Sequence, residues 1–249
     1  MTETPPERPF EETLALALDE MGLPLDPMAR DQLRSFAEML AESNRRFNLV
    51  ADASPTTMAI KHMADSLLLL TTNALEGLRV RYAVDIGAGA GFPGIPLAIA
   101  RQDITWLLIE STGKKARFLE ELIFSLGLEN VSISNSRSEE LAHNAVKRES
   151  YDLAVIRGLA HCATLCELGL PFVKVGGRLF SYKGPDGERE AAESAAAAEA
   201  CGGTVRPLIR AQLPIEHHPR LFIGWDKTSA TPSKYPRREG VPQKSPIMG

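Results

Sequence analysis

The glycine-rich stretch at residues 84–96, VDIGAGAGFPGIP, constrains the fold more than any other part of the chain. Its apolar start predicts a short buried strand, and its prolines are typical of the first turn of a helix. Glycines between a strand and a helix let the backbone turn tightly and let a ligand approach closely. Because the first turn of a helix leaves backbone N–H groups unpaired, the stretch predicts a cradle for a small molecule.

Two ligands fit this cradle, and a tight turn without a ligand is the alternative. Gly89, Gly91 and Gly94 satisfy the GxGxxG pattern of dinucleotide sites, and Glu110 ends the next expected strand, where such sites hold the ribose. Asp85 discriminates between the ligands, because a carboxylate directly before the glycines repels a pyrophosphate and attracts an ammonium group. S-adenosylmethionine carries both an ammonium and a sulfonium. These residues therefore favour S-adenosylmethionine over a nicotinamide or flavin dinucleotide.

From residue 81 onward, expected strands alternate with expected helices. The strands are expected at 82–86, 104–109, 131–134, 151–156 and 178–182, and the helices at 93–101, 113–126, 139–146 and 163–173. This alternation predicts a mostly parallel sheet with helices on both faces. An alanine-rich helix at 188–201 leads to two strands, 204–213 and 221–226, whose short connection makes them antiparallel. A parallel sheet with a terminal antiparallel hairpin is the α/β, Rossmann-like architecture of class I methyltransferases.

Helical periodicity at 14–21, 27–44 and 58–75 predicts an N-terminal helical cap. The chain is therefore expected to comprise four parts. These are a disordered arm (1–8), the helical cap (9–76), an S-adenosylmethionine-binding methyltransferase core (77–227) and a basic C-terminal tail (228–249).

The net charge of −4 is unevenly distributed along the chain. Residues 226–249 hold five basic and two acidic side chains, a local balance of +3, so the remainder carries −7. A basic tail on an acidic body is a candidate phosphate-binding arm, and a solvated tail without a partner is the alternative.

Polar side chains follow each of the five expected parallel strands. They are Asp85, Glu110, the run at 136–139, Arg157 and Lys183. Ligands of such sheets bind at the carboxyl ends of the strands, close to the point where the strand order reverses. We therefore expect these groups to converge on a single pocket.

Cys162, Cys166 and Cys201 do not suggest a disulfide framework, and burial as small apolar side chains explains them better than a metal site. The five histidines have no metal-ligand spacing, so we expect no metal. No apolar run is long enough to span a membrane, and the N-terminus is unlike a signal peptide. These features predict a cytoplasmic protein without a membrane partner.

Seven segments match the pattern of one known family. They are NRRFNL (44–49), HMADS (62–66), the glycine-rich loop (85–97), GKKARFL (113–119), SRSEE (136–140), YKG (182–184) and YPRREGVPQK (235–244). Together they resemble the RsmG (GidB) family, the bacterial 16S rRNA guanine-N7 methyltransferases. Two departures are Ser43, where the family usually has tryptophan, and Arg157, whose neighbours differ from the usual serine and alanine. Local capping alone would explain 44–49 and 62–66, whereas the resemblance implies RNA or cofactor binding.

The resemblance also implies roles for single residues. Gly87 and Phe92 would line the cofactor, Ser138 and Glu139 would face its adenine, and Arg157 would reach its methionine part or the target. The expected cofactor contacts in full are Asp85, Gly87, Gly89, Gly91, Phe92, Glu110, Ser138, Glu139 and Arg157. The expected phosphate contacts to RNA are Lys183, Arg237 and Arg238.

The implied reaction is methylation of a guanine N7 in the decoding region of 16S rRNA. N7 has an exposed lone pair and no proton, so in-line transfer of the methyl group needs no general base. Because N7 lies in the deep groove of A-form RNA, the target guanine should lie in an irregular or opened segment. The partner would be 16S rRNA or a small-subunit ribonucleoprotein, and we expect the enzyme to be a monomer.

Other functions remain open at this point. A class I methyltransferase could act on another RNA, on a protein or on a small molecule, because the fold does not determine the substrate. A nucleotide-binding regulatory module without catalysis and a dehydrogenase are two further alternatives.

Overall fold

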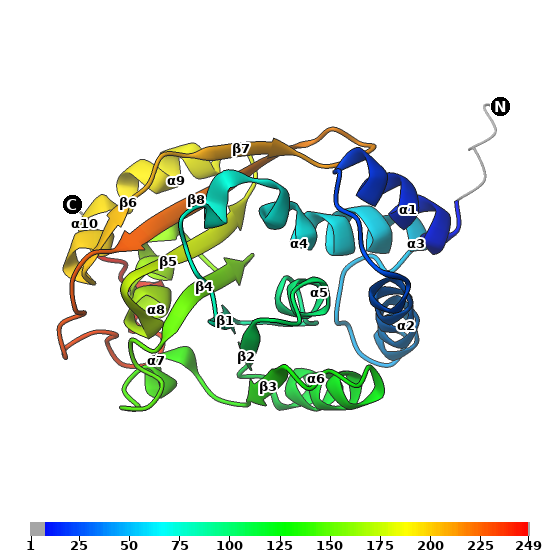
Figure 1. The fold of residues 1–249 in the computed structure, drawn as a ribbon. Coiled ribbons are helices and arrows are strands. Elements are labelled where there is room, and N and C mark those ends of the chain that lie inside the picture. Colours follow the sequence, from blue (N-terminus) through cyan, green and yellow to red (C-terminus); the bar gives the residue numbers. More distant parts are fainter. Residues whose placement is uncertain (1–7, 249) are drawn as a thin grey trace.

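A sheet of eight strands forms the centre of the molecule in the computed structural model, which describes residues 8–248 (Figure 1). Of the disordered arm expected at residues 1–8, residues 1–7 lie outside the described residues. The strands are β1 (Tyr82–Ile86), β2 (Thr105–Ile109), β3 (Val131–Ser134), β4 (Tyr151–Arg157), β5 (Val173–Lys183), β6 (Gly203–Val205), β7 (Ile209–Gln212) and β8 (Pro219–Lys227). Their order in the sheet is β3-β2-β1-β4-β5-β8-β6, and β7 also pairs with β8.

The five strands β1 to β5 are parallel, whereas β8 is antiparallel to β5, β6 and β7. The predicted mostly parallel sheet with an antiparallel end is therefore confirmed. The chain places β2 and β3 on one side of β1, then places β4 and β5 on the other side. This reversal makes the carboxyl ends of β1 and β4 the expected place for a ligand.

Two strand boundaries differ from those expected. The single strand expected at 204–213 is wrong, because this segment forms the two separate strands β6 and β7. Pro207 lies between them, and proline has no N–H to donate to a strand ladder. Strand β5 begins at Val173 rather than at 178, and its pairing with β4 is irregular before Arg178. Gly176, with φ +88°, lies in this irregular part. The glycine breaks the run of strand-forming residues, so the sequence indicated a later start of the strand.

The N-terminal cap begins with α1 (Phe10–Glu20) and α2 (Pro27–Asn44). Asp26 caps α2 by accepting a hydrogen bond from the N–H of Ala29 at 2.8 Å. The third expected helix, 58–75, is a chain of short pieces instead. These are α3 (Pro55–Thr57), a π-helical turn (Met58–Ala64), α4 (Asp65–Leu67) and two 3-10 turns (Leu68–Thr71 and Asn73–Leu75). The Ser66 hydroxyl donates to the carbonyl of His62 at 2.6 Å, so a side chain competes there for a backbone acceptor.

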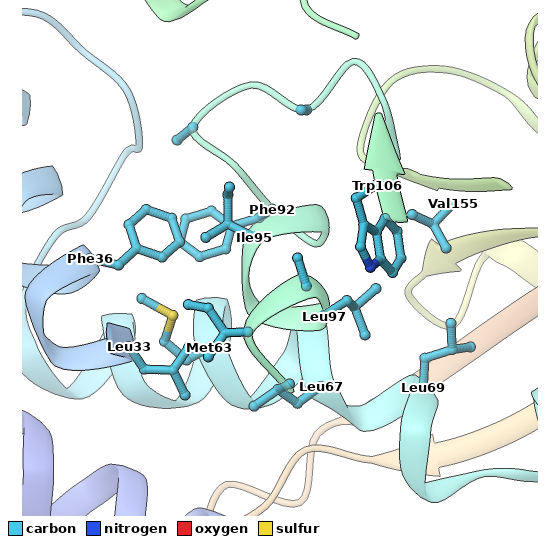
Figure 2. Packing of buried hydrophobic residues seen from close by; sticks show 14 of the residues in the cluster. Leu33, Phe36, Met63, Leu67, Leu69, Phe92, Ile95, Leu97, Trp106 and Val155 are labelled. Carbon is cyan, nitrogen blue, oxygen red and sulfur yellow. The ribbon is translucent and has the colours of Figure 1, made fainter. Parts of the chain in front are cut away.

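Helices cover both faces of the sheet (Figure 1). One hydrophobic core lies between the sheet, the cap, α5 (Gly94–Ala100) and α6 (Gly113–Ser125), and the other lies against α8 (Cys162–Gly169) and α10 (Ala195–Ala200). Alternating residues of β4 enter the two cores, Leu153 and Val155 on one face and Ala154 and Ile156 on the other. Figure 2 shows the first core, in which side chains of α2 meet Phe92 of the glycine-rich loop.

The remaining helices are short. They are α7 (Ser138–Leu141), a 3-10 turn (Leu170–Phe172), α9 (Gly187–Glu193) and α11 (Val241–Lys244). The alanine-rich helix expected at 188–201 is divided into α9 and α10 at Ser194. The Ser194 hydroxyl donates to the carbonyl of Ala191 at 2.7 Å and accepts from Trp225 at 3.1 Å, so it competes with the helical hydrogen bonds.

The three cysteines are buried, as predicted. Within residues 8–248, no helix combines the length and the apolar character that a membrane crossing requires. The same residues hold no group of three or more histidine, cysteine or acidic side chains arranged as metal ligands.

Candidate functional site

The glycine-rich loop leaves β1 and turns toward β2. Gly87, Gly89 and Gly91 all have positive φ angles, which favour glycine. The Glu110 carboxylate at the end of β2 accepts hydrogen bonds from the N–H groups of Gly89 at 2.9 Å and of Thr112 at 2.7 Å. Glu110 therefore fixes the loop to the segment after β2. Each of its oxygens keeps a second lone pair that a ribose hydroxyl could use.

Asp85 lies beneath this loop and is fully buried. Its Oδ2 accepts a hydrogen bond from the N–H of Gly94 at the start of α5, at 2.8 Å. A Cβ at Gly94 would lie 2.6 Å from the same oxygen, so this close approach requires glycine. Within residues 8–248, Asp85 Oδ1 has no hydrogen-bond partner. Burial raises the pKa of Asp85 to about 7, because the charged carboxylate is poorly solvated there, and a cation bound beside it would stabilise the charged form.

A pocket opens beside the loop, at the carboxyl ends of β1, β2, β3 and β4. Its lining is Ile86, Gly87, Ile109, Ser111, the run at 136–139, Leu159, Leu168 and Gln243. Leu159 follows β4 and packs over Gly87, where an added Cβ would lie 2.3 Å from the leucine Cδ1. The pocket brings together Gly87, Ser138 and Glu139 from the residues expected to contact the cofactor.

The C-terminal segment, residues 228–248, closes one side of this pocket. The backbone N–H of Gly240 donates to Glu139 at 3.0 Å, and the Thr164 hydroxyl on α8 donates to the carbonyl of Pro242 at 3.1 Å. In Figure 1 this segment, coloured orange to red, runs alongside α7 and α8. The basic tail therefore packs against the core at the pocket.

Arg237 attaches the C-terminal segment to α8. Its backbone N–H and its guanidinium bind the Glu167 carboxylate, with an Nη2 to Oε2 distance of 2.6 Å. The Glu167 side chain is only 1% exposed, whereas Arg238 is exposed. Lys183, expected to contact RNA as well, donates to the carbonyl of Ala160 at 2.6 Å and to Glu190 at 2.8 Å. Of the three expected phosphate contacts, Lys183 and Arg237 thus have partners within the protein.

A second group of polar residues joins the cap to the ends of β4 and β8. The Arg157 guanidinium donates to the carbonyl of Lys61 at 2.5 Å and lies 3.2 Å from the Asp65 carboxylate. Asp65 also accepts from Arg220 at 2.8 Å, and its side chain is 3% exposed. Arg157 therefore connects β4 to the HMADS segment of the cap. Its expected contact with the cofactor or target stays a prediction.

Phe92 connects this group to the glycine-rich loop. Its ring stacks on Phe36 at 4.9 Å (Figure 2). It also stacks on His62 at 4.8 Å, and the Arg157 guanidinium lies 5.8 Å from the ring centre. Burial, followed by the charge of Arg157, lowers the pKa of His62 to about 4. His62 is therefore neutral near pH 7, and no sequence signal indicated this. Asn44 has a local structural role, because its side-chain oxygen accepts hydrogen bonds from the N–H groups of Leu49 and Val50.

We expect the free energy of unfolding to fall less between pH 7 and pH 4.5 in the His62→Phe variant than in the wild type. The pKa of His62 in the folded protein lies below its ordinary value of 6.5, so between pH 6.5 and about 4 the unfolded chain binds this proton more readily. Stability therefore falls as the pH falls through this window, and phenylalanine removes the titration while keeping the stack on Phe92. Urea unfolding at pH 7 and pH 4.5 measures the difference, and an equal loss in both proteins would contradict the assignment.

A family model described as rRNA small subunit methyltransferase G (GidB) matches residues 29–217. The chain belongs to this family. A protein from Dehalococcoides mccartyi named ribosomal RNA small subunit methyltransferase G is 39% identical over 236 residues, 94% of this chain and 99% of that protein. The protein of the same name from Oenococcus oeni is 40% identical over 233 residues, 93% of this chain and 95% of that protein. The resemblance inferred from the sequence motifs is confirmed.

Among solved structures, a glutamate-to-glutamine mutant of MtNAS in complex with S-adenosylmethionine has a similar fold. The TM-score is 0.52 at 15% identity, and the match covers 87% of this chain and 78% of that one. At this identity the likeness concerns the fold alone. Together with the strand order, it confirms the predicted class I methyltransferase fold.

In this member of the GidB family, five of the nine expected cofactor residues lie in two neighbouring places. The other four do not line the pocket and belong to the glycine-rich loop or hydrogen-bond to it: Asp85, Gly89, Gly91 and Glu110. Gly87, Ser138 and Glu139 line the pocket, whereas Phe92 and Arg157 belong to the group that faces the cap. Several pocket residues were not expected from the sequence, and two of them shape the pocket walls. They are Leu159, which carries no polar group, and Gln243, which lies in a segment interpreted from its positive charge.

Proposed function

We propose that this chain transfers a methyl group from S-adenosylmethionine to N7 of a guanine in the decoding region of 16S rRNA. The observation that carries the proposal is the pocket formed by the ends of four parallel strands, next to the buried Asp85, in a chain of the GidB family. The relatives named ribosomal RNA small subunit methyltransferase G support rRNA as the substrate.

The residues around the loop fit this cofactor chemically. Asp85 Oδ1 is a buried acceptor without a partner within residues 8–248, and it would bind an ammonium group. Glu110 would accept hydrogen bonds from the ribose hydroxyls, and Gly87 and Gly89 would let the backbone approach the ligand. When bound, S-adenosylmethionine supplies an electrophilic methyl group on its sulfonium.

Catalysis would rest on positioning, because guanine N7 has a free lone pair and needs no base. His62, neutral at pH 7, and the Phe92 ring form a stacked face between the glycine-rich loop and the cap. We propose that the target guanine approaches the cofactor from this side, with Arg157 fixing the geometry of the cap. Holding N7, the methyl carbon and the sulfur in line would supply most of the rate enhancement.

The test is methyl transfer from labelled S-adenosylmethionine to 16S rRNA and to small ribosomal subunits, followed by mapping of the modified nucleotide. Label at N7 of a single guanine is the expected result. Label on an exocyclic nitrogen or a carbon, or on transfer RNA or protein alone, would favour another class I methyltransferase. Cofactor binding with no transfer to any of these would favour a regulatory module.

Among the proposed RNA contacts, Arg238 has the most accessible side chain, because Lys183 and Arg237 would first have to leave Glu190 and Glu167. We propose a monomer that acts where small subunits are assembled, in the cytoplasm. Analytical ultracentrifugation tests the monomer.

We expect Arg238→Ala to weaken RNA binding and to flatten its salt dependence. Loss of one phosphate contact reduces the slope of log K against log salt concentration by about 0.7–0.9. Filter binding of 16S rRNA fragments at several salt concentrations measures the slope. Arg101→Ala is the control, because Arg101 follows α5 at the opposite end of the sheet from the pocket. Equal slopes for both variants would remove Arg238 from the RNA surface.

A further inference from the structure

The pocket at the strand ends has one wall that comes from the C-terminal segment. Gln243 belongs to α11 and lines the pocket together with Gly87, Ser111 and Ser138. We propose that Gln243 recognises the adenine of the cofactor through its carboxamide, so that the C-terminal segment is part of the cofactor site. This inference rests on the proposed location of S-adenosylmethionine in this pocket.

The backbone on both sides of Gln243 is held by side chains of the protein. The carbonyl of Pro242 accepts from the Thr164 hydroxyl at 3.1 Å, and the carbonyl of Ser245 accepts from Arg237 at 2.8 Å. Thr164 and Pro242 are themselves buried. The backbone that carries the exposed Gln243 side chain is therefore held in place beside the pocket, which a recognition residue needs.

Apart from Ser111, the other polar residues of the pocket are already paired with protein groups. Glu139 accepts from the N–H of Gly240 at 3.0 Å and from the Ser138 hydroxyl at 3.1 Å. Ser136 shares a hydrogen bond with Ser134 at 2.9 Å, and Arg137 pairs with Glu239 at 2.9 Å. Glu139 thus holds the C-terminal segment in place, and its expected contact with the adenine stays a prediction.

A carboxamide matches adenine because both carry a donor beside an acceptor. The 6-amino group of adenine donates, and the neighbouring ring nitrogen accepts, so a glutamine amide can make two parallel hydrogen bonds to the base. A serine hydroxyl is a single group and cannot span both positions. Among the described residues that line the pocket, Gln243 is the one carboxamide.

The experiment is a binding cycle that combines variants of Gln243 with two ligands. The ligands are S-adenosylhomocysteine and its 6-deamino analogue, in which hydrogen replaces the 6-amino group. The wild type should bind the adenine ligand about tenfold more tightly, the value expected for one to two neutral hydrogen bonds. Q243A should bind it about tenfold more weakly and lose the preference, whereas Q243E, which keeps an acceptor, should retain a preference for the 6-amino group. Isothermal titration calorimetry gives each dissociation constant.

Two further variants separate the possible failures. Gln102 lies in the turn after α5 and is exposed, so Q102A should bind both ligands as the wild type does. Ser111→Trp places a large side chain in the pocket and should weaken binding of both ligands at least about tenfold, since overpacking excludes the base. Normal binding by the Ser111 variant would overturn the proposed location of the cofactor. Weak binding by that variant with an unchanged base preference in Q243A would overturn the role of Gln243 alone.

Discussion

Arg237→Ala is expected to lower the free energy of unfolding by about 3–5 kcal/mol, because it leaves a buried carboxylate without its partner. Glu167 is 1% exposed and receives hydrogen bonds from the backbone N–H, Nε and Nη2 of Arg237. The backbone N–H remains in the variant, but it cannot balance a full charge. Urea unfolding at pH 7 measures the loss.

Two variants serve as controls for this prediction. Arg238→Ala changes the exposed neighbour and should shift stability by less than about 0.5 kcal/mol. In the double variant Arg237→Ala/Glu167→Leu, both charges are absent from an apolar helix, so most of the lost stability should return. If Arg237→Ala is as stable as Arg238→Ala and only weakens RNA binding, Arg237 is an RNA contact as first expected, and the structural role is wrong.

Asp85→Asn is expected to stabilise the protein without cofactor while weakening cofactor binding. The pKa of Asp85 is raised by burial from its ordinary 3.8 to about 7. The folded protein therefore holds this proton more tightly than the unfolded chain does. The resulting contribution to the free energy of unfolding is fully present below pH 3.8 and is lost as the pH rises through 7. Asparagine keeps an acceptor for the N–H of Gly94 and carries no charge, so at pH 8 it should raise the free energy of unfolding by roughly 2–4 kcal/mol.

The same substitution removes the negative charge proposed to hold the ammonium group of the cofactor. A hydrogen bond between charged groups contributes about 1.5–3 kcal/mol, so S-adenosylhomocysteine should bind roughly 10 to 100 times more weakly. Urea unfolding at pH 5 and pH 8 and calorimetric titration at pH 8 measure the two effects. Equal affinity in Asp85→Asn would exclude Asp85 from the cofactor site.

Asp152 on the adjacent strand β4 provides the matched control. It is also buried, but Lys174 and the N–H groups of Tyr82 and Arg81 outweigh its burial and lower its pKa. Asp152→Asn should therefore destabilise the protein at pH 8, with the opposite sign from Asp85→Asn, and should leave cofactor affinity unchanged. A stabilising effect at Asp152 would indicate that the burial argument is wrong for both residues.

Local patterns were sufficient to predict the sheet and the loop. Strands β1 to β4 begin and end within one residue of the expected bounds, because buried apolar runs between polar ends are typical of parallel strands. The loop could be predicted because its glycines adopt positive φ angles that other residues avoid. The change from π to α to 3-10 hydrogen bonding in residues 58–75 could not, because each piece is only three to seven residues long, too short for its apolar spacing to distinguish the helix types.

The C-terminal segment was harder to interpret, because its pairing depends on distant residues. A run of lysines and arginines has the same composition whether it is solvated, bound to RNA or packed on the protein. The sequence feature that indicates a packed tail is Glu167, a single acid in the apolar sequence CATLCELG of α8. Such a residue requires a buried cationic partner, but the sequence does not indicate which of the basic residues is that partner.

The Glu167–Arg237 ion pair also imposes an order in time on the biosynthesis of the protein. The two residues are 70 positions apart, and a ribosome that adds about 5–20 residues per second needs roughly 4–14 s to cover that interval. Until Arg237 has been synthesised, Glu167 of α8 lacks the cation that balances its charge when it is buried. We therefore expect the half of the core around α8, and the cofactor pocket with it, to reach its final packing only near the end of translation.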